Sequence, residues 1–249
     1  MSAAPATDLL DAGRHHRAKL GFVLLSMEQT IEGDLFELAP EGVGVHVTRA
    51  PMADDVTVEN LREMAAGLRP AADLILPELT LDVLCYACTS GSIVIGPAEV
   101  RRQLASTGRA RSVTTLVDGV VSALRALTAR RISVLTPYVE GINELEDAHL
   151  RAEGFTIDAF TGLGITRDQD IARVRPAALA DLAVQHTHPD SDALFISCGA
   201  LRTLDVIEEI EERIGRPVIT SNQAMMWDCL RRAGVRDQLS GRGRIFREH

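Results

Sequence analysis

Two cysteines occupy matching places in this sequence, because each follows directly on an apolar run. Cys88 ends the run 83–87 and is followed by small polar residues, whereas Cys198 ends the run 193–197 and precedes a helical pattern at 201–214. Small polar residues end a buried strand and leave backbone N–H groups free for a helix N-terminus. A thiol there faces unpaired amides and the positive end of the helix dipole, and both favour the thiolate. We therefore predict two reactive thiols, with a moderate lowering of the pKa below the ~8.5 of free cysteine. Both pKa values need not be low together, because two thiolates that face each other raise one of them.

The other two cysteines are predicted to be core residues. Cys85 lies inside the apolar run, on the face opposite to Cys88, and Cys229 lies in a helical pattern beside Trp227. Free cysteine is among the residue types that are most often buried. Cys88 and Cys198 are therefore expected to be alkylated faster at neutral pH than the other two.

Several other chemistries lack the residues that they need. Cys85 and Cys88 form a C-x-x-C, but a structural zinc site needs about four ligands, and the sequence has no second C-x-x-C and no suitably spaced histidine pair. It also contains no G-x-x-x-x-G-K-[ST] phosphate loop, no dinucleotide fingerprint and no G-x-S-x-G elbow. We therefore expect no metal site.

Composition narrows the function classes further. The chain has 249 residues and a formal net charge of -9, which argues against nonspecific binding of nucleic acid. No apolar run approaches the ~20 residues of a membrane span, so no membrane partner is expected. Residues 1–18 lack the apolar core of a signal peptide and are expected to form an N-terminal tail. Four cysteines in a chain of this length are no disulfide framework, so a reducing, cytoplasmic location is the simplest prediction.

The elements that must position the two thiols alternate between strands and helices along the chain. The predicted strands are 20–25, 44–48, 83–87, 113–116, 131–135, 155–160, 194–197 and 218–220. The predicted helices are 29–38, 57–68, 99–106, 117–130, 141–152, 177–185, 201–214 and 223–232. Such alternation predicts an α/β protein with parallel sheets, in which ligands bind outside the carboxyl ends of the strands.

A constant offset indicates that the chain contains a duplication. Three pairs of landmarks are each 110 residues apart, namely Glu28 and Tyr138, Gly44 and Gly154, and Cys88 and Cys198. Two half-repeats that face each other bring the two thiols to opposite walls of one cleft. We predict a tail at 1–18, a first α/β lobe at 19–116 completed by 218–249, and a second α/β lobe at 117–217.

Several motifs resemble those of the aspartate/glutamate racemase superfamily, and within it most closely the maleate cis–trans isomerases and the racemase-like proteins of ectoine utilisation. The motifs are Cys88-Thr-Ser-Gly91, Thr136-Pro-Tyr138, Ser197-Cys198, Leu201-Arg-Thr-Leu-Asp205 and Ser221-Asn-Gln223. The resemblance covers nearly the whole chain after the first 18 residues. It implies two pseudo-symmetric α/β lobes with the active site between them, no cofactor, and a homodimer.

The resemblance also implies roles for individual residues. Cys88 is the expected first base or nucleophile, Cys198 the opposing acid, and Tyr138 a hydrogen-bond donor to the substrate. A small carboxylic acid is the implied substrate, and its carboxylate needs donors in a site with a reactive thiol. The expected donors are Thr89, Ser90 and the backbone amides of Gly199 and Ala200.

Three departures from the family pattern bear on the substrate. Glu28 and Asp168 stand where such isomerases carry asparagine, and an acid in that place attracts an ammonium group and repels a carboxylate. An isomerase or racemase of an amino-substituted acid is therefore favoured. The third departure is Cys198-Gly-Ala, which is nearer to the Cys-Gly-Gly of arylmalonate decarboxylases. One alternative is thus a decarboxylase that uses Cys198, and another is a non-catalytic protein that binds a small molecule.

Overall fold

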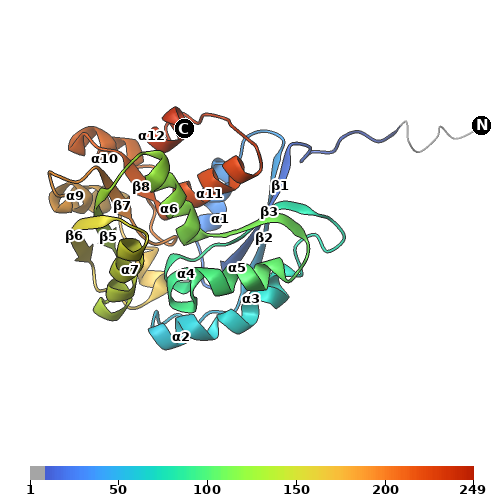
Figure 1. The fold of residues 1–249 in the computed structure, drawn as a ribbon, viewed down its shortest axis with the longest axis horizontal. Coiled ribbons are helices and arrows are strands. Elements are labelled where there is room, and N and C mark those ends of the chain that lie inside the picture. Colours follow the sequence, from blue (N-terminus) through green and yellow to red (C-terminus); the bar gives the residue numbers. More distant parts are fainter. Residues whose placement is uncertain (1–8) are drawn as a thin grey trace, which may run out of the picture.

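The computed structural model describes residues 9–249 and contains two four-stranded parallel sheets with helices packed around them (Figure 1). The first sheet is formed by β1 (Ala18–Leu25), β2 (Val43–Ala50), β3 (Leu81–Tyr86) and β4 (Ala110–Thr115). The second sheet is formed by β5 (Arg131–Thr136), β6 (Thr156–Gly162), β7 (Ala193–Ile196) and β8 (Val218–Thr220). The predicted α/β class with parallel sheets is thereby confirmed.

The two sheets have the same topology. The strand order is β2-β1-β3-β4 in the first sheet and β6-β5-β7-β8 in the second. The strands that precede the two cysteines, β3 and β7, therefore occupy equivalent inner positions. This repeat of one strand order agrees with the duplication that the constant offset predicts.

Twelve helices accompany the sheets within the described residues. They are α1 (Ile31–Glu37), α2 (Val58–Glu63), α3 (Ala65–Ala72), α4 (Thr89–Ile95), α5 (Pro97–Ala105), α6 (Leu116–Ala126), α7 (Glu140–Ala152), α8 (Asp168–Ile171), α9 (Pro176–His186), α10 (Ile207–Ile214), α11 (Ser221–Arg232) and α12 (Arg244–Glu248). Within residues 9–249, no helix combines the length and the apolar character that crossing a bilayer requires.

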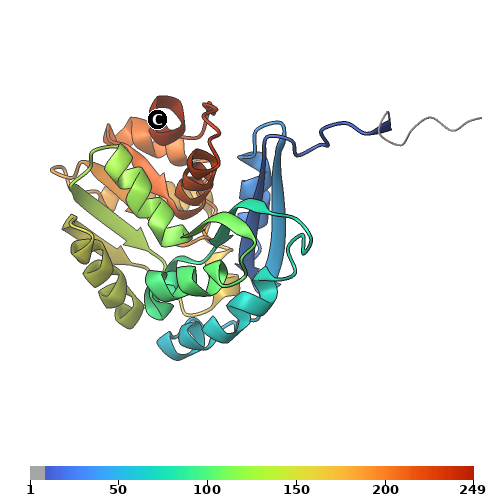
Figure 2. The ribbon, with the colours of Figure 1, turned by 45° about the vertical axis from the view of Figure 1, so that its right-hand side comes forward.

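Helices α6 and α11 pack against each other between the two sheets, as Figures 1 and 2 both show. Helix α6 begins with a capping box formed by Thr115 and Asp118, and at the start of α11 the backbone N–H of Thr220 donates to Gln223 Oε1 at 3.0 Å. A capping box satisfies two backbone donors that the first turn of a helix leaves free. Both helices therefore start at a fixed residue, directly after β4 and β8.

The structure corrects two expectations about elements. The helix predicted at 201–214 begins only at Ile207, and residues 201–206 are irregular, with a turn at 204–206. Residues 218–249 were assigned to the first lobe, but β8 pairs with β7 in the second sheet. Helix α11, which follows β8, contacts β3 and β4, so the chain returns to the first sheet by a helix and not by a strand.

The predicted N-terminal tail is described only in part. Residues 1–8 lie outside the described residues, and β1 begins at Ala18. Arg17 forms an ion pair with Asp237, and its guanidinium donates to the carbonyl oxygen of Glu41. The end of the tail is thus attached to the folded part by contacts with two other segments.

Candidate active site

Cys88 caps the N-terminus of α4 with its sulfur. The Cys88 Sγ accepts a hydrogen bond from the backbone N–H of Gly91 at 3.2 Å, and the hydroxyl of Ser90 lies 3.7 Å from it. Gly91 is required here, because a Cβ at this position would lie 2.5 Å from the Tyr86 hydroxyl and 2.9 Å from the Cys88 sulfur. The predicted placement of Cys88 between a strand end and a helix N-terminus is correct.

Cys198 is held by a different local structure. Its φ is +96°, in the left-handed region that non-glycine residues rarely adopt, and its backbone N–H donates to the Ser221 hydroxyl at 3.0 Å. The next helix in the described chain begins only at Ile207. The prediction that Cys198 precedes a helix N-terminus is therefore wrong: a strained turn presents this thiol.

Both thiols open into one small pocket between the two sheets. The pocket has about 20 Å³ of space for water, which is room for about one molecule. All nine predicted site residues line it, namely Glu28, Cys88, Thr89, Ser90, Tyr138, Asp168, Cys198, Gly199 and Ala200. The remaining lining residues are Leu25, Ile31, Met52, Val56 and Ala87. No signal in the sequence marks Met52 or Val56, because an apolar residue that lines a site cannot be distinguished by its type from a core residue.

Burial dominates the electrostatics of the thiols. It raises the pKa of Cys88 to about 11, against the smaller lowering effects of the Gly91 N–H, Ser90 and Tyr86. Burial also raises the pKa of Cys198, and hydrogen bonds from Tyr138 and from the backbone of Ala200 oppose this only in part. The predicted moderate lowering is therefore wrong, because the pKa is raised for both thiols. A thiolate loses more hydration in this pocket than the nearby amides return.

Tyr138 is fixed beside Cys198 by hydrogen bonds to its own backbone. Its N–H donates to Thr136 Oγ1 at 3.2 Å, and its carbonyl oxygen accepts from the side chain of Asn143 at 3.0 Å. Burial, followed by the charges of Cys198 and Glu146, raises the pKa of Tyr138 well above its usual value. The phenol therefore stays protonated and can donate a hydrogen bond.

Two acidic residues, Glu28 and Asp168, line the pocket. Glu28 Oε1 accepts hydrogen bonds from the backbone N–H groups of Thr30 and Ile31, so this oxygen caps α1. Burial raises the pKa of Asp168 to about 6, and the charges of Glu28 and Asp54 add to the shift. Asp168 is thus mostly ionised at neutral pH. Among the described residues that line the pocket, none is basic.

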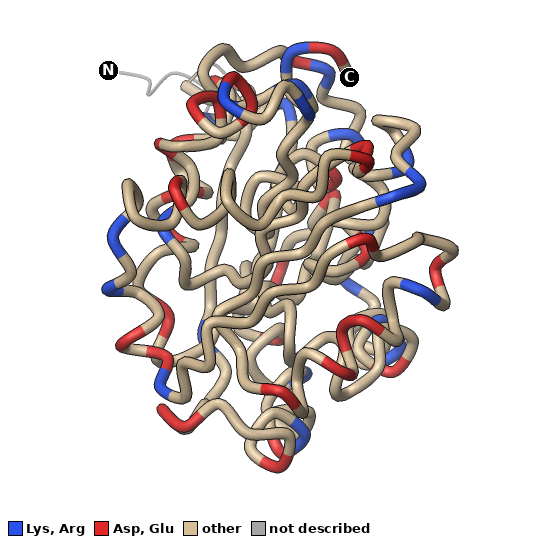
Figure 3. The backbone as a smooth tube through the Cα atoms, turned by 90° about the vertical axis from the view of Figure 1, so that its left-hand side faces the viewer, with Lys and Arg blue, Asp and Glu red and all other residues tan. Residues whose placement is uncertain are grey.

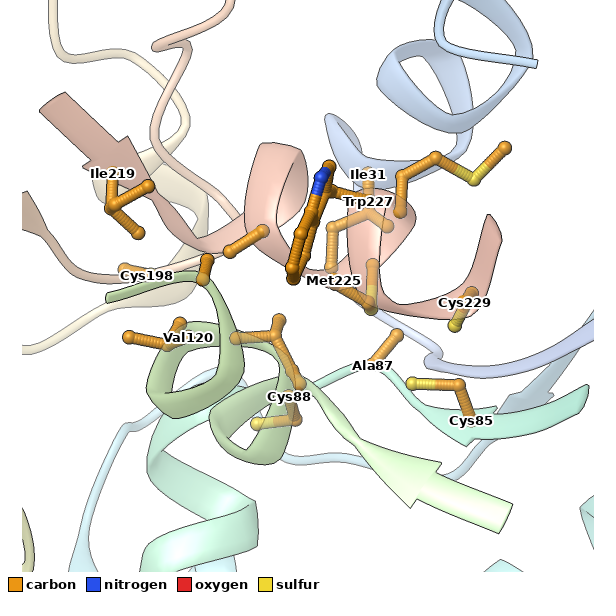
Figure 4. Close-up of a cluster of buried hydrophobic side chains, with 14 of the residues drawn as sticks. Ile31, Cys85, Ala87, Cys88, Val120, Cys198, Ile219, Met225, Trp227 and Cys229 are labelled. Atoms are coloured by element: carbon orange, nitrogen blue, oxygen red, sulfur yellow. The ribbon is translucent and has the colours of Figure 1, made fainter. Parts of the chain in front are cut away.

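Cys85 and Cys229 lie apart from this pocket. Both are fully buried, and the Cys85 thiol donates to the carbonyl oxygen of Tyr86 at 3.6 Å. Figure 4 shows them on one side of the buried cluster, away from Cys88 and Cys198. Desolvation raises the pKa of Cys85 well above its usual value. Their interpretation as core residues agrees with the structure.

Comparisons with known proteins relate this chain to arylmalonate decarboxylases and maleate isomerases. A sequence model of the arylmalonate decarboxylase family matches residues 79–246. Arylmalonate decarboxylase of Bordetella bronchiseptica is 42% identical over 138 residues, which make up 54% of this chain and 58% of that protein. Maleate isomerase of Nocardia farcinica is 30% identical over 242 residues, which cover 92% of this chain and 96% of the relative.

A solved structure of the Nocardia farcinica maleate cis–trans isomerase has the same fold. It is a cysteine-to-serine variant with a covalently bound succinylcysteine intermediate, and it aligns with a TM-score of 0.84 at 28% identity over 93% of this chain and 99% of that one. The predicted superfamily is thereby confirmed. The relatives include isomerases and a decarboxylase, which supports a cysteine-dependent enzyme of one of these two kinds. This chain belongs to the arylmalonate decarboxylase family, within the aspartate/glutamate racemase-like superfamily.

Proposed function

We propose that the protein is a two-thiol isomerase, and specifically a racemase, of a small amino-substituted carboxylic acid, and that it uses no cofactor. The observation that carries the proposal is that Cys88 and Cys198, from equivalent strand ends of the two sheets, line one pocket. Two proton carriers on different walls of a pocket can act on two faces of one carbon atom. One thiol alone can exchange a proton on only one face.

The proposed reaction balances with these two groups. The Cys88 thiolate removes the proton from Cα, and the electron pair of that C–H bond delocalises into the substrate carboxylate. The Cys198 thiol then gives its proton to the opposite face of Cα. The reaction leaves a Cys88 thiol and a Cys198 thiolate, from which the reverse reaction starts. Hydrogen bonds to the carboxylate stabilise the charge that develops on it; the proposed donors are Thr89, Ser90, Tyr138 and the amides of Gly199 and Ala200.

The charges of the pocket favour an amino group on the substrate. Glu28 and Asp168 both line the pocket, and no basic residue among the described lining residues balances them. A dicarboxylate such as maleate would bring two further negative charges into this buried space, where charge repulsion is weakly screened. An ammonium group beside Cα can instead pair with one of the two carboxylates.

An ammonium group also helps to form the thiolate. The pKa of Cys88 is raised to about 11 in the ligand-free protein, mainly by burial and also by the charge of Asp168. A cation in the pocket stabilises the thiolate and lowers this pKa. We therefore expect the base to form only after the substrate is bound.

Exchange at Cα in D₂O tests the proposal. Amino acids, diamino acids and dicarboxylates are incubated with the protein, and 1H NMR and chiral chromatography follow exchange and inversion. Amino-substituted acids should exchange and invert, whereas maleate should remain unchanged. Cys88→Ser and Cys198→Ser should each abolish inversion. Absence of exchange with every amino-substituted acid, or conversion of maleate to fumarate, would contradict the substrate class.

A decarboxylase is the second candidate, because the family model and the relative of highest identity given above both point to it. In that reaction the substrate loses one carboxylate as CO₂, and Cys198 protonates the resulting carbanion. A carboxyl-labelled arylmalonate measures it through the release of labelled CO₂. Release that survives Cys88→Ser and disappears in Cys198→Ser would favour this function over the racemase.

A further inference from the structure

The turn that carries Cys198 is held by residues outside its own strand. Cys198 has a φ of +96°, a conformation that persists only where the surroundings enforce it. The turn has no helix of its own to fix it, because the next described helix starts at Ile207. The contacts that hold residues 198–200 come instead from α11 and from the residue before α1.

Each of the three residues of the turn makes one such backbone hydrogen bond. The N–H of Cys198 donates to the Ser221 hydroxyl at 3.0 Å. The carbonyl oxygen of Gly199 accepts from Asn222 Nδ2 at 2.8 Å, and that of Ala200 accepts from the hydroxyl of Thr30 at 3.0 Å. The backbone of the turn is therefore fixed at three successive positions.

Ser221 also connects this turn to the other thiol. Its hydroxyl lies 2.9 Å from the hydroxyl of Thr89, the residue that follows Cys88. One buried oxygen thus contacts the Cys198 backbone and the first residue of α4. Any displacement of Ser221 changes the relative placement of the two thiols.

Helix α1 holds the side chain of Asn222. The turn at residues 198–200 also has no room to move toward that helix. Asn222 Nδ2 donates to Asp34 Oδ2 at 2.8 Å as well as to Gly199. A Cβ on Gly199 would lie 2.5 Å from Ile31 Cδ1 and 3.0 Å from Asn222 Oδ1. The glycine and the amide side chain therefore fit against each other without spare room.

We propose that Ser221 and Asn222 are positioning residues for the Cys198 thiol: they hold its turn in the left-handed conformation and keep it in register with Cys88. Neither side chain lines the pocket, so neither is proposed to touch the substrate. The effect on turnover rests on the proposed function, whereas the effect on the thiol itself does not.

Ser221→Ala tests the proposal, with Ser221→Thr as the conservative variant that restores a hydroxyl. Ser133→Ala is a matched control in the second sheet. The Ser133 hydroxyl is buried, accepts the backbone N–H of His188 at 2.8 Å and lies 2.9 Å from the Ser191 hydroxyl. It therefore makes the same kinds of contact as Ser221, but none with the thiol turns. If Ser221→Ala does not fold, Asn222→Ala makes the same test by removing the donor to Gly199.

Two measurements are made on each variant. Iodoacetamide labelling with peptide mapping gives the alkylation rates of Cys198 and Cys88, and steady-state kinetics gives kcat and KM. In Ser221→Ala we expect Cys198 to be alkylated about tenfold faster, because a relaxed turn exposes the sulfur, while Cys88 changes less than about twofold. A misplaced acid lowers kcat by about 100-fold with little change in KM. Ser221→Thr should restore most of the kcat and bring the alkylation rate of Cys198 back close to that of the wild type.

Two outcomes would overturn the proposal. One is a Cys198 alkylation rate in Ser221→Ala within about twofold of the wild type. The other is an equal change in Ser133→Ala, which would show a general effect of losing a buried hydroxyl. The alkylation measurement needs no turnover, so it remains decisive even if the proposed racemase activity is not found.

Discussion

Glu146 is a buried acid in α7 that the proposed reaction does not use. Its side chain is fully buried, and neither carboxylate oxygen has a hydrogen-bond partner within residues 9–249. Burial raises its pKa from 4.5 to about 7, and the nearby Ser197 hydroxyl opposes the shift. The folded protein therefore holds a proton on Glu146 in a pH range where the unfolded chain has released it.

Replacing Glu146 should change how stability depends on pH. Because the pKa is higher in the folded state, this group's stabilisation is complete below pH 4.5 and is lost as pH rises through about 7. The loss is roughly 3 kcal/mol for a shift of this size. Glu146→Gln should therefore gain roughly that much stability relative to the wild type between about pH 4.5 and pH 8. Urea unfolding across this range measures the difference.

The control for this prediction is Glu144→Gln, an exposed change in the same helix. It should leave the pH dependence of the wild type in place. A free-energy difference between Glu146→Gln and the wild type that stays constant with pH would show that Glu146 is ionised in the folded protein.

The thiols should be distinguishable by their alkylation rates. Cys88 and Cys198 line the pocket, and Cys85 and Cys229 lie in the core, so the first two should be labelled first in the folded protein. Only the thiolate reacts, and the pKa of Cys88 is about 11. The alkylation rate of Cys88 should therefore rise about tenfold per pH unit from pH 7 to 10. Iodoacetamide labelling with peptide mapping measures both. If Cys85 or Cys229 is labelled first, the two-thiol pocket is wrong.

For individual residues, the sequence was sufficient to predict many of the side chains that line the site, but not how deeply they are buried. The repeat marked Cys88 and Cys198, and both line the pocket. Their raised pKa values could not be predicted, because desolvation depends on side chains from the other half of the molecule. The role of Glu28 in capping α1 was also missed, since it depends on where that helix begins.

Helices α6 and α11 are in close contact at Gly119. A Cβ at this position would lie 3.0 Å from the Cα of Met225 and 3.1 Å from the carbonyl oxygen of Ala224. Backbone atoms cannot move away as a flexible side chain can. Gly119 therefore sets the distance between the two helices, and with it the position of Ser221 at the start of α11.

Gly119→Ala should destabilise the protein by about 1–3 kcal/mol, which is typical of an overpacked contact. Gly141→Ala is the control: this glycine lies in the first turn of α7, and a Cβ there meets no atom of the described chain within 4 Å. An alanine in such a helix position should be neutral or stabilising by up to about 1 kcal/mol. Chemical denaturation compares the two variants. Equal stabilities would mean that the helices separate without penalty.

The elements themselves were largely predictable from the sequence. Every predicted strand is present, and most of them are short apolar runs between turn residues. The helix predicted at 201–214 starts too early, because the apolar residues at 201, 204 and 206 fit a helical spacing. In the structure they are buried side chains of an irregular segment that precedes the helix. Which sheet β8 joins was not predictable, because three residues carry no information about their partner strand.

At the scale of the molecule, the proposed site depends on both sheets. Charged residues of both signs are spread around the periphery in Figure 3, and the pocket is lined by residues from both halves. The space of about 20 Å³ is smaller than a carboxylic acid substrate needs. Binding of such a substrate therefore requires the pocket to widen.

Ligand binding should stabilise the whole chain as one unit. A ligand present at 100 times its Kd adds about 2.7 kcal/mol, which for a chain of this size raises the Tm by roughly 5–10 °C. Calorimetry should show a single transition that shifts as a whole. Cys88→Ser should keep most of this shift and lose turnover. A ligand that stabilises the wild type, with no turnover of any substrate, would instead support the non-catalytic binding protein.

The two thiols stand at equivalent strand ends, but the backbone around them has diverged. Cys88 caps a helix, whereas Cys198 sits in a left-handed turn. The two mirror-image forms of a substrate therefore meet unlike proton donors, although their equilibrium mixture must still be racemic. In D₂O, optical rotation that starts from one enantiomer should overshoot zero before it settles, and the overshoot from the other enantiomer should differ in size. The divergence of an ancient duplicate would then be readable in the shape of a polarimeter trace.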